Sequence, residues 1–199
     1  MKYFCFDTAI NGTFTLLLLQ KEYPGQQCLF HETNDAGIWD AAPWLFVTEN
    51  NVFEQINHPL ASLHHTVFFE SPETIDDLRQ HLQSFIYKKI EDKEYFFRFW
   101  DARVLLNYLS GCSQTQLEAF YGEPIDSIYV EDENKDQLLR LQINRKNKLE
   151  KGLITKKAFF ENKSIAGKEE QPTSADKIQS DKKEKDTEEN TNRRRFLMD

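Results

Sequence analysis

The chain has 199 residues, of which 39% are hydrophobic and 16 are phenylalanine, so it can bury a sizeable core without help from metals or disulfides. Its formal net charge of −8 argues against a nucleic-acid surface, because binding to phosphates needs clustered Lys and Arg. The three cysteines, Cys5, Cys28 and Cys112, form no Cys-x-x-Cys pair, which is typical of a reducing cytosol and predicts neither a zinc site nor a redox pair.

The first third of the chain predicts short, aromatic elements. We expect strands at residues 3–6, 28–31 and 44–48, helices at 10–20 and 52–56, and a loop or single helical turn at 35–40. Thr13, Phe14 and Thr15 would also suit a strand, so two interpretations of residues 10–20 stay open. Trp39 lies in the predicted loop and is therefore expected to be exposed.

The clearest helix follows a strand predicted at residues 66–70. Ser71 is expected to cap this helix, with Pro72 at the first helical position and acidic residues in the first turn. The apolar stripe of the helix has helical spacing and consists of Ile75, Leu78, Leu82, Phe85 and Ile86. Such a stripe predicts a helix that packs against a sheet.

Residues 94–106 combine an aromatic strand, a helix cap and two arginines. The aromatic residues from Tyr95 to Trp100 predict a largely buried strand, and Asp101 stands where a helix N-cap is expected. In a structural interpretation, Asp101 is only a cap, and Arg98 and Arg103 pair with neighbouring carboxylates. In a functional interpretation, the same residues contact a partner.

The rest of the chain predicts a further helix, a last strand and two further segments. Ser113 and Gln116 have the spacing of a capping box, and residues 127–130 predict the last strand. We expect residues 1–130 to form a mixed α+β domain, with helices packed on a central mixed sheet. Residues 131–161 are expected to form a short helical appendage with an apolar anchor at its end. They carry a small basic patch made of Arg140, Arg145, Lys146 and Lys148.

Residues 162–199 are expected to form a disordered tail, because charged and polar residues dominate and cannot offset the entropy of ordering. The nine basic and nine acidic residues between Lys163 and Asp199 cancel, so the rest of the chain carries the whole net charge of −8. A neutral or basic protein partner would suit such an acidic body.

Four motifs in order give the chain a family resemblance. The segment from Arg98 to Arg103, Arg-Phe-Trp-Asp-Ala-Arg, resembles the Arg-Phe-Tyr-Asp-Pro-Arg motif of the effector adaptors, or chaperones, of bacterial type VI secretion, long described as a domain of unknown function. Three further stretches resemble motifs of that family: residues 42–45, residues 71–82 and residues 121–125. The resemblance covers residues 2–130. Ala102 departs from the family's proline, Glu123 is an insertion, and a longer helical C-terminal lobe is missing.

The resemblance implies a cytoplasmic adaptor that binds a toxin effector and loads it onto a secretion spike protein of the valine-glycine repeat type. We expect no cofactor and no metal, and the resemblance directs attention to aromatic and arginine anchors for partner binding. On that basis, the candidate partner-binding residues are Arg98, Asp101, Arg103, Trp100 and Trp44. Trp44 and Trp100 lie in predicted strands, where a place in the core is the competing interpretation.

Two alternatives stay open at this stage. An acidic cytosolic protein of this size would also suit an immunity protein that blocks a toxin. A hydrolase would need a site such as Asp7 and Asp101 with a histidine, yet the chain has no phosphate-binding glycine motif, nucleophile elbow or His-Glu-x-x-His. His64 and His65 are adjacent, and on a strand they would point to opposite faces, which disfavours a shared metal. We therefore predict a binding protein.

No apolar run approaches the roughly twenty residues of a membrane helix, and the first residues lack the apolar core of a signal peptide. We therefore expect a soluble protein that does not engage a membrane.

Overall fold

A computed structural model describes residues 1–161, which form a seven-stranded sheet in the order β2-β3-β1-β4-β7-β8-β9. These strands are β1 (Lys2–Asp7), β2 (Gln27–Cys28), β3 (Pro43–Val47), β4 (Val67–Glu70), β7 (Ser127–Glu131), β8 (Gln137–Ile143) and β9 (Leu149–Thr155). Each pair of neighbours in this sheet is antiparallel. The α+β class is confirmed, but the sheet is antiparallel where the sequence suggested a mixed one.

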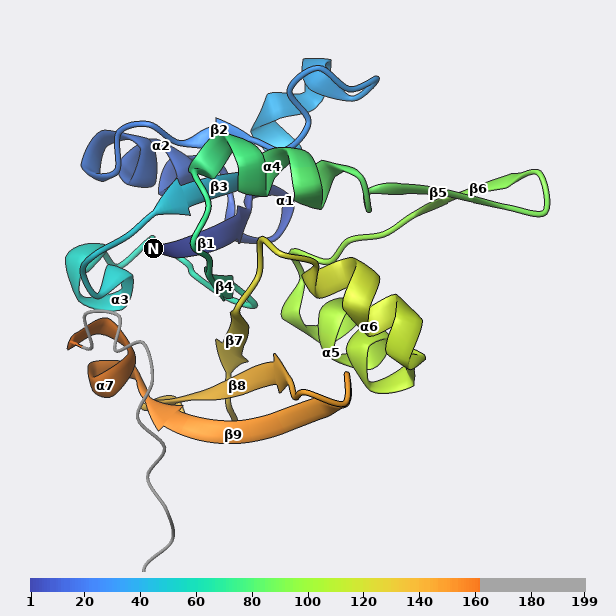
Figure 1. Ribbon diagram of the computed structural model, residues 1–199. Helices are drawn as coiled ribbons and strands as arrows, with labels where there is room; N and C mark the ends of the chain where they lie inside the picture. The colour runs from blue at the N-terminus through green and yellow to red at the C-terminus, as the bar shows by residue number, and fades with distance from the viewer. Residues whose placement is uncertain (162–199) are drawn as a thin grey trace, which may run out of the picture. The chain divides into compact units, whose positions relative to one another are not determined.

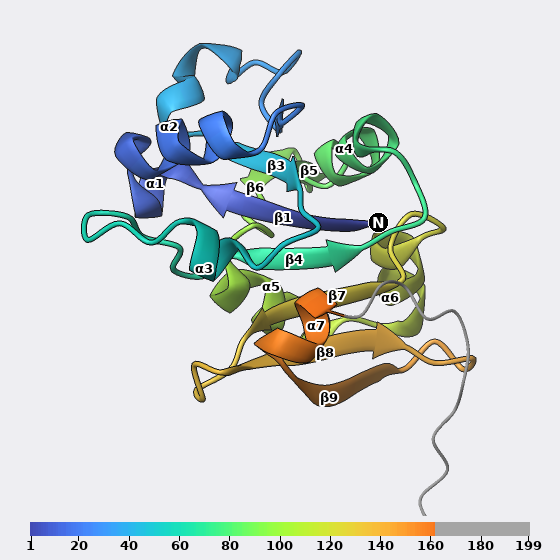
Figure 2. The same cartoon turned by 90° about the vertical axis from the view of Figure 1, so that its left-hand side faces the viewer.

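Helices cover both faces of the sheet (Figure 1, Figure 2). One face carries α2 (Thr13–Glu22), α3 (Val52–Gln55) and α7 (Lys156–Glu161); the other carries α4 (Ile75–Gln83), α5 (Ala102–Gly111) and α6 (Gln114–Tyr121). The short helix α1 (Thr8–Asn11) directly follows β1, and the 3₁₀ helix η1 (Ala36–Ala41) precedes β3. Side chains alternate between the two faces along each strand: Phe4 and Phe6 join one core cluster, whereas Tyr3 and Cys5 join the other.

The helix predicted at residues 10–20 is confirmed as α1 and α2, with Gly12 between them at φ +82°. A non-glycine residue would be strained at that angle, so Gly12 explains the break between the two helices. Helix α3 and the 3₁₀ turn η1 also lie where the sequence placed them. The strand interpretation of Thr13–Thr15 is therefore wrong.

Helix α4 confirms the apolar stripe from Ile75 to Leu82, but the helix ends at Gln83, so Phe85 and Ile86 lie beyond it, and the cap also differs from the prediction. Leu78 and Leu82 are fully buried against the sheet. The cap, however, is Thr74, whose side chain accepts a hydrogen bond from the Asp77 N–H. Ser71 instead accepts from the Glu73 N–H and closes a turn ahead of the helix. The N-cap of α4 therefore lies three residues later than the Ser-Pro signal predicts.

Residues 131–161 do not form the predicted helical appendage. They continue the main sheet as β8 and β9, which pair with β7 and with each other, and only α7 is helical. Leu138 points to one face of the sheet and Leu141 to the other, and both are fully buried, because both faces of β8 are covered. A strand that is buried on both faces lacks the alternation of apolar and polar residues, so its sequence pattern cannot be told from that of a buried helix.

The domain boundary expected at residue 130 is therefore wrong, since the sheet runs across it. The apolar anchor at residues 158–160 is confirmed: Phe159 and Phe160 of α7 are buried against Phe68. The tail predicted at residues 162–199 lies outside the described residues.

The aromatic segment after Glu94 also differs from its prediction. Only β6 (Lys93–Phe96) is a strand, and it pairs with β5 (Tyr87–Ile90) in a separate hairpin that projects from the sheet (Figure 1). Tyr95 and Phe96 are about half exposed, so this strand is not the buried element that its composition suggests. Asp101 donates its N–H to the Arg98 carbonyl oxygen, and this turn delivers Phe99 and Trp100 into the core.

No helix within residues 1–161 combines the length and the apolar character needed to cross a membrane.

Candidate functional site

Two buried aspartates, Asp7 and Asp101, each cap a helix and bind an arginine of the Arg98–Arg103 motif. Asp7 ends β1 and caps α1 by accepting a hydrogen bond from the Ala9 N–H at 3.0 Å. Its second carboxylate oxygen accepts from an Arg98 Nη at 2.6 Å. The Asp7 side chain is 2% exposed, whereas that of Arg98 is 40% exposed. Arg98 therefore neutralises a buried charge while it keeps part of its guanidinium at the surface.

Asp101 makes the second pair. As the sequence predicts, it caps α5, accepting from the Arg103 N–H, and the Arg103 guanidinium binds the same carboxylate through both Nε and Nη at 3.0 and 2.7 Å. Burial alone would raise the pKa of Asp101, but these hydrogen bonds outweigh it and hold the pKa below its usual value. The same hydrogen bonds raise the pKa of Arg103.

Asn11 ties the loop before β4 to the end of β1. Its amide nitrogen donates to the carbonyl oxygens of Asp7 and His64, and its amide oxygen accepts from the His64 N–H and the Ser62 hydroxyl. The side chain is buried, and each of its polar atoms is hydrogen-bonded, as a buried amide requires. The loop that carries His64 and His65 is thereby fixed beside the Asp101 cap.

A shallow hollow of about 180 Å³ lies beside Arg98. We call it the aromatic hollow, and its main lining residues are Asp7, Phe30, Ile38, Phe96, Arg98 and Trp100. Phe30, Phe96 and Trp100 contact one another edge to face or tilted, with ring centroids 5.6 to 5.9 Å apart. Ile38 and Phe96 are 49% and 48% exposed, so apolar surface from two distant elements meets at the rim.

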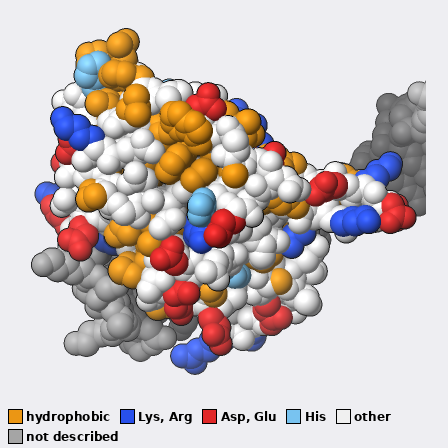
Figure 3. All heavy atoms as spheres, turned by 90° about the horizontal axis from the view of Figure 1, so that it is seen from above, with side chains coloured by type: hydrophobic (Ala, Val, Ile, Leu, Met, Phe, Trp, Pro, Cys, Tyr) orange, Lys and Arg blue, Asp and Glu red, His pale blue; other side chains and the backbone are white. Residues whose placement is uncertain are grey.

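Hydrophobic side chains gather on the face seen from above, the face that carries η1 in Figure 1 (Figure 3). Trp39 of η1 is 47% exposed, as the sequence predicts. Two hydrogen bonds fix the rim: the Trp44 indole N–H donates to the Trp39 carbonyl oxygen at 3.1 Å, and the Tyr87 hydroxyl donates to the Asp35 carboxylate. The second bond joins the base of the β5–β6 hairpin to the loop that leads into η1.

The structure separates the five residues that the sequence suggested for partner binding. Arg98 lines the aromatic hollow, and Trp100, only 2% exposed, forms its wall. Trp44 of β3 is partly buried, and its indole N–H is hydrogen-bonded to the backbone of η1. Asp101 is buried, and Arg103 lies beside His65 in another depression. Of the five residues, Arg98 and Arg103 thus keep exposed side chains, whereas Asp101, Trp100 and much of Trp44 are covered.

Sequence reasoning missed Ile38, Phe96 and Phe30 as parts of one surface. Ile38 carried a usable signal, because an isoleucine beside a tryptophan in a segment rich in Asp and Gly is an apolar residue where a solvated loop is expected. No signal in the sequence indicated that η1 lies close to β6, since residues 38 and 96 are far apart in the chain.

The titratable groups within residues 1–161 form no metal site: no group of three or more His, Cys, Asp or Glu side chains there could hold an ion. The carboxylates of Asp7 and Asp101 are each bound by an arginine and by a helix N-terminus. Burial raises the pKa values of the Cys5, Cys28 and Cys112 thiols, which disfavours the reactive thiolate form.

A comparison with known protein families identifies the family of this chain. The model of a domain of unknown function, DUF4123, matches residues 3–119, more than half of the chain. The chain belongs to the DUF4123 family. The DUF4123 match includes the aromatic hollow and both Asp–Arg pairs, and it ends within α6. No curated protein and no solved structure matched the chain.

The Asp101 cap gives a pH-dependent prediction. Asp101→Asn keeps a capping oxygen but removes the charge, so it should lower the melting temperature at pH 7 by roughly 2–4 °C, the change that about 1 kcal/mol causes in a chain of this size. Because the pKa of Asp101 is lowered in the folded state, its contribution is present above the unfolded-state pKa and is lost as pH falls through the folded-state pKa.

The gap in melting temperature between the wild type and Asp101→Asn should therefore shrink as pH falls from 7 towards 3. Thermal melts followed by circular dichroism across this range provide the measurement. A gap that stays constant, or widens in acid, would contradict the assignment.

Proposed function

We propose that the chain is a cytoplasmic adaptor of bacterial type VI secretion, which binds a toxin effector and loads it onto a spike protein of the valine-glycine repeat type. Membership of the DUF4123 family supports this function, together with the four motifs that resemble those of type VI adaptors. The observation that carries the proposal is the aromatic hollow, because it has the composition of a protein-binding hot spot.

Hot spots in protein interfaces are rich in aromatic residues and arginine, and they lie where packed side chains exclude water. The aromatic hollow presents Phe96 and Ile38 at its rim, with the partly exposed Arg98 between apolar walls. A partner side chain that enters the hollow would remove both rim residues from water. It would meet a guanidinium with donors beyond the one held by Asp7.

The hollow is also preorganised. Asp7 fixes Arg98, Trp44 fixes η1, and Tyr87 fixes the base of the hairpin that carries Phe96. A surface whose side chains are already ordered loses less conformational entropy when a partner binds. This rigidity supports a recognition role for a surface that would otherwise only expose apolar atoms to water.

The test is affinity capture of the tagged full chain from its own cells, with mass spectrometry of the bound proteins. We expect one toxin and a spike protein to co-purify. Phe96→Ala and Ile38→Ala should each reduce the yield of one of these partners at least tenfold, because losing a hot-spot side chain costs about 2 kcal/mol or more.

Tyr95→Ala is the matched control. Tyr95 is 50% exposed on the same strand, but successive side chains of a strand point to opposite faces, and Tyr95 does not line the hollow. This variant should keep wild-type capture. Equal capture by all three variants would reject the hollow as the binding surface. Inhibition of the toxin's enzymatic activity by the purified chain would favour an immunity protein, and substrate turnover would favour a hydrolase.

A further inference from the structure

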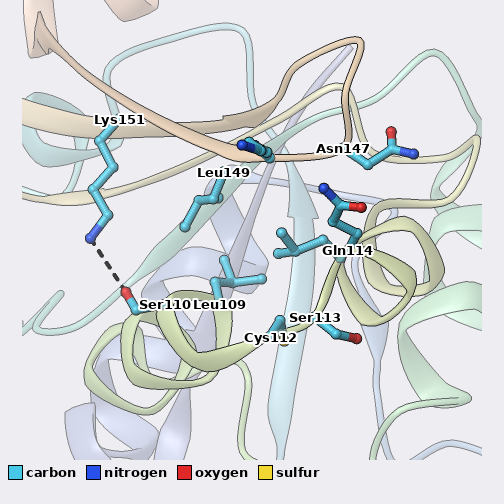
Figure 4. A pocket seen from close by; sticks show the side chains of 10 residues that line it. Leu109, Ser110, Cys112, Ser113, Gln114, Asn147, Leu149 and Lys151 are labelled. Carbon is cyan, nitrogen blue, oxygen red and sulfur yellow. Dashed lines mark hydrogen bonds between the residues drawn. The ribbon is translucent and has the colours of Figure 1, made fainter.

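Another concave surface lies where the end of α5 and the start of α6 face the β8–β9 hairpin, and its volume is about 510 Å³ (Figure 4). We call it the basic groove, and its main lining residues are Leu109, Leu117, Asn147, Lys148, Leu149 and Lys151. Leu109 and Leu117 are buried, and with Leu149 they make an apolar floor. The lysines stand at the rim, and Lys151 reaches across to donate to the Ser110 hydroxyl at 3.3 Å.

Positive charge is concentrated around the basic groove. Arg145, Lys146, Lys148 and Lys151 come from one hairpin and are exposed, and within residues 1–161 none of them forms an ion pair. Glu118 and Glu150 each accept a hydrogen bond from a side-chain amide of this hairpin. Asn147 donates to the Glu118 carboxylate, and Asn144 donates to that of Glu150 at 2.8 Å. A cluster of unpaired cations on an otherwise acidic chain favours an acidic occupant.

The backbone beside the groove favours an extended occupant. Strand β9 ends the order of the main sheet, and in the described part of the chain its backbone pairs only with β8 (Figure 2). Every second residue of such a strand turns its N–H and C=O groups away from its neighbour, ready to pair with another strand. Leu149, Lys151 and Leu153 alternate along β9, and Leu153 is 60% exposed on the same face as the groove.

We propose that the basic groove and the free edge of β9 bind an extended, acidic segment of another protein, which adds to the sheet as a further strand. Its backbone would pair with β9, its apolar side chains would cover Leu149 and Leu153, and its carboxylates would meet Lys148 and Lys151. A nucleic acid is disfavoured, because Glu118 and Glu150 flank the cations and the chain as a whole is acidic.

This surface is separate from the aromatic hollow, so the binding is expected whether or not the chain works as an adaptor. The basic groove and the aromatic hollow also draw their residues from different parts of the chain. Its floor comes partly from the region matched by DUF4123, and its lysines come from residues beyond that match.

The test uses the full chain and two labelled seven-residue peptides, Leu-Ser-Glu-Ser-Leu-Ser-Glu and Leu-Ser-Lys-Ser-Leu-Ser-Lys, which carry their leucines and their charges on one face of a strand, as β9 does with Leu149, Lys151 and Leu153. Fluorescence anisotropy should show at least tenfold tighter binding of the acidic peptide. The double variant Lys148→Glu/Lys151→Glu should lose at least tenfold for the acidic peptide and gain affinity for the lysine peptide. Both lysines are exposed, so the variant should melt like the wild type.

Lys89→Glu/Lys93→Glu is the matched control, since it makes the same charge change on exposed residues of the β5–β6 hairpin. This variant should bind the acidic peptide as the wild type does. If both double variants lost the same affinity for the acidic peptide, the loss would come from the change in net charge alone, and the proposal would be overturned. Tighter binding of a single-stranded oligonucleotide than of the acidic peptide would also overturn it.

N-methylation of the peptide tests strand addition itself. Two peptides carry the methyl groups on alternate sets of residues, and only one set would point its N–H groups towards β9. One methylated peptide should bind at least tenfold more weakly than the other. Equal binding of the two would exclude backbone pairing and overturn the proposed geometry.

Discussion

A chain that ends at Val130 should fail to fold, whereas one that ends at Glu161 should melt cooperatively. The short chain lacks β8, β9 and α7, and with them Leu138, Leu141, Phe159 and Phe160, all of them buried. Burying four such side chains stabilises a fold by roughly 6–12 kcal/mol, which is as large as the whole stability of a typical domain.

The loss would also expose surfaces that are now covered. Strand β7 pairs with β8 along its length, so its removal turns a central strand into an edge. Tyr129 and Phe68, which pack on Phe159, would face water. We therefore expect the short chain to aggregate.

The measurement is soluble yield and thermal melting of the two truncated chains beside the full chain. The chain that ends at Glu161 is the matched control, because it keeps every described element. A short chain that is soluble and melts cooperatively near the temperature of the full chain would show that residues 1–130 form a domain of their own.

The elements that the sequence predicted well are those whose signals are local. Asp101 caps α5, and Ser113 and Gln116 form the capping box of α6, because a cap needs only residues within the same turn. The stripe of α4 was equally clear, because a helix that covers a sheet has one apolar and one polar face.

The prediction failed where distant partners decide the structure. Residues 137–143 contain leucine, glutamine and arginine, which favour helices, yet pairing with β7 makes them a strand. The exposed aromatics of β6 suggest a core strand until the hairpin is seen to project from the sheet.

The candidate site was predictable only in part, for the same reason. The motif from Arg98 to Arg103 marked the correct region, but the partner of Arg98 is Asp7, 91 residues away. Neither the loop fixed by Asn11 nor the meeting of Ile38 with Phe96 follows from spacing along the chain. The aromatic hollow is a product of topology, since β1, η1 and the end of β6 converge there.

Leu82→Asp should prevent folding. Leu82 is fully buried in the cluster between α4 and the sheet, so the change removes a packed side chain and leaves a carboxylate without water or a partner. Replacing a buried leucine with a smaller side chain costs about 3–5 kcal/mol, and an unpaired buried charge costs several kcal/mol more. The sum reaches the stability of a typical domain of about 5–15 kcal/mol.

Gln80→Asp separates the effect of burial from that of adding an acidic residue to the helix. Gln80 is exposed on the outer side of α4, so this variant should lose less than about 1 kcal/mol, as surface substitutions usually do. Circular dichroism and thermal melting should show a cooperative transition for Gln80→Asp and none for Leu82→Asp. A soluble, cooperatively melting Leu82→Asp protein would mean that α4 does not bury its stripe against the sheet. The apolar face of the helix would then be free for another role.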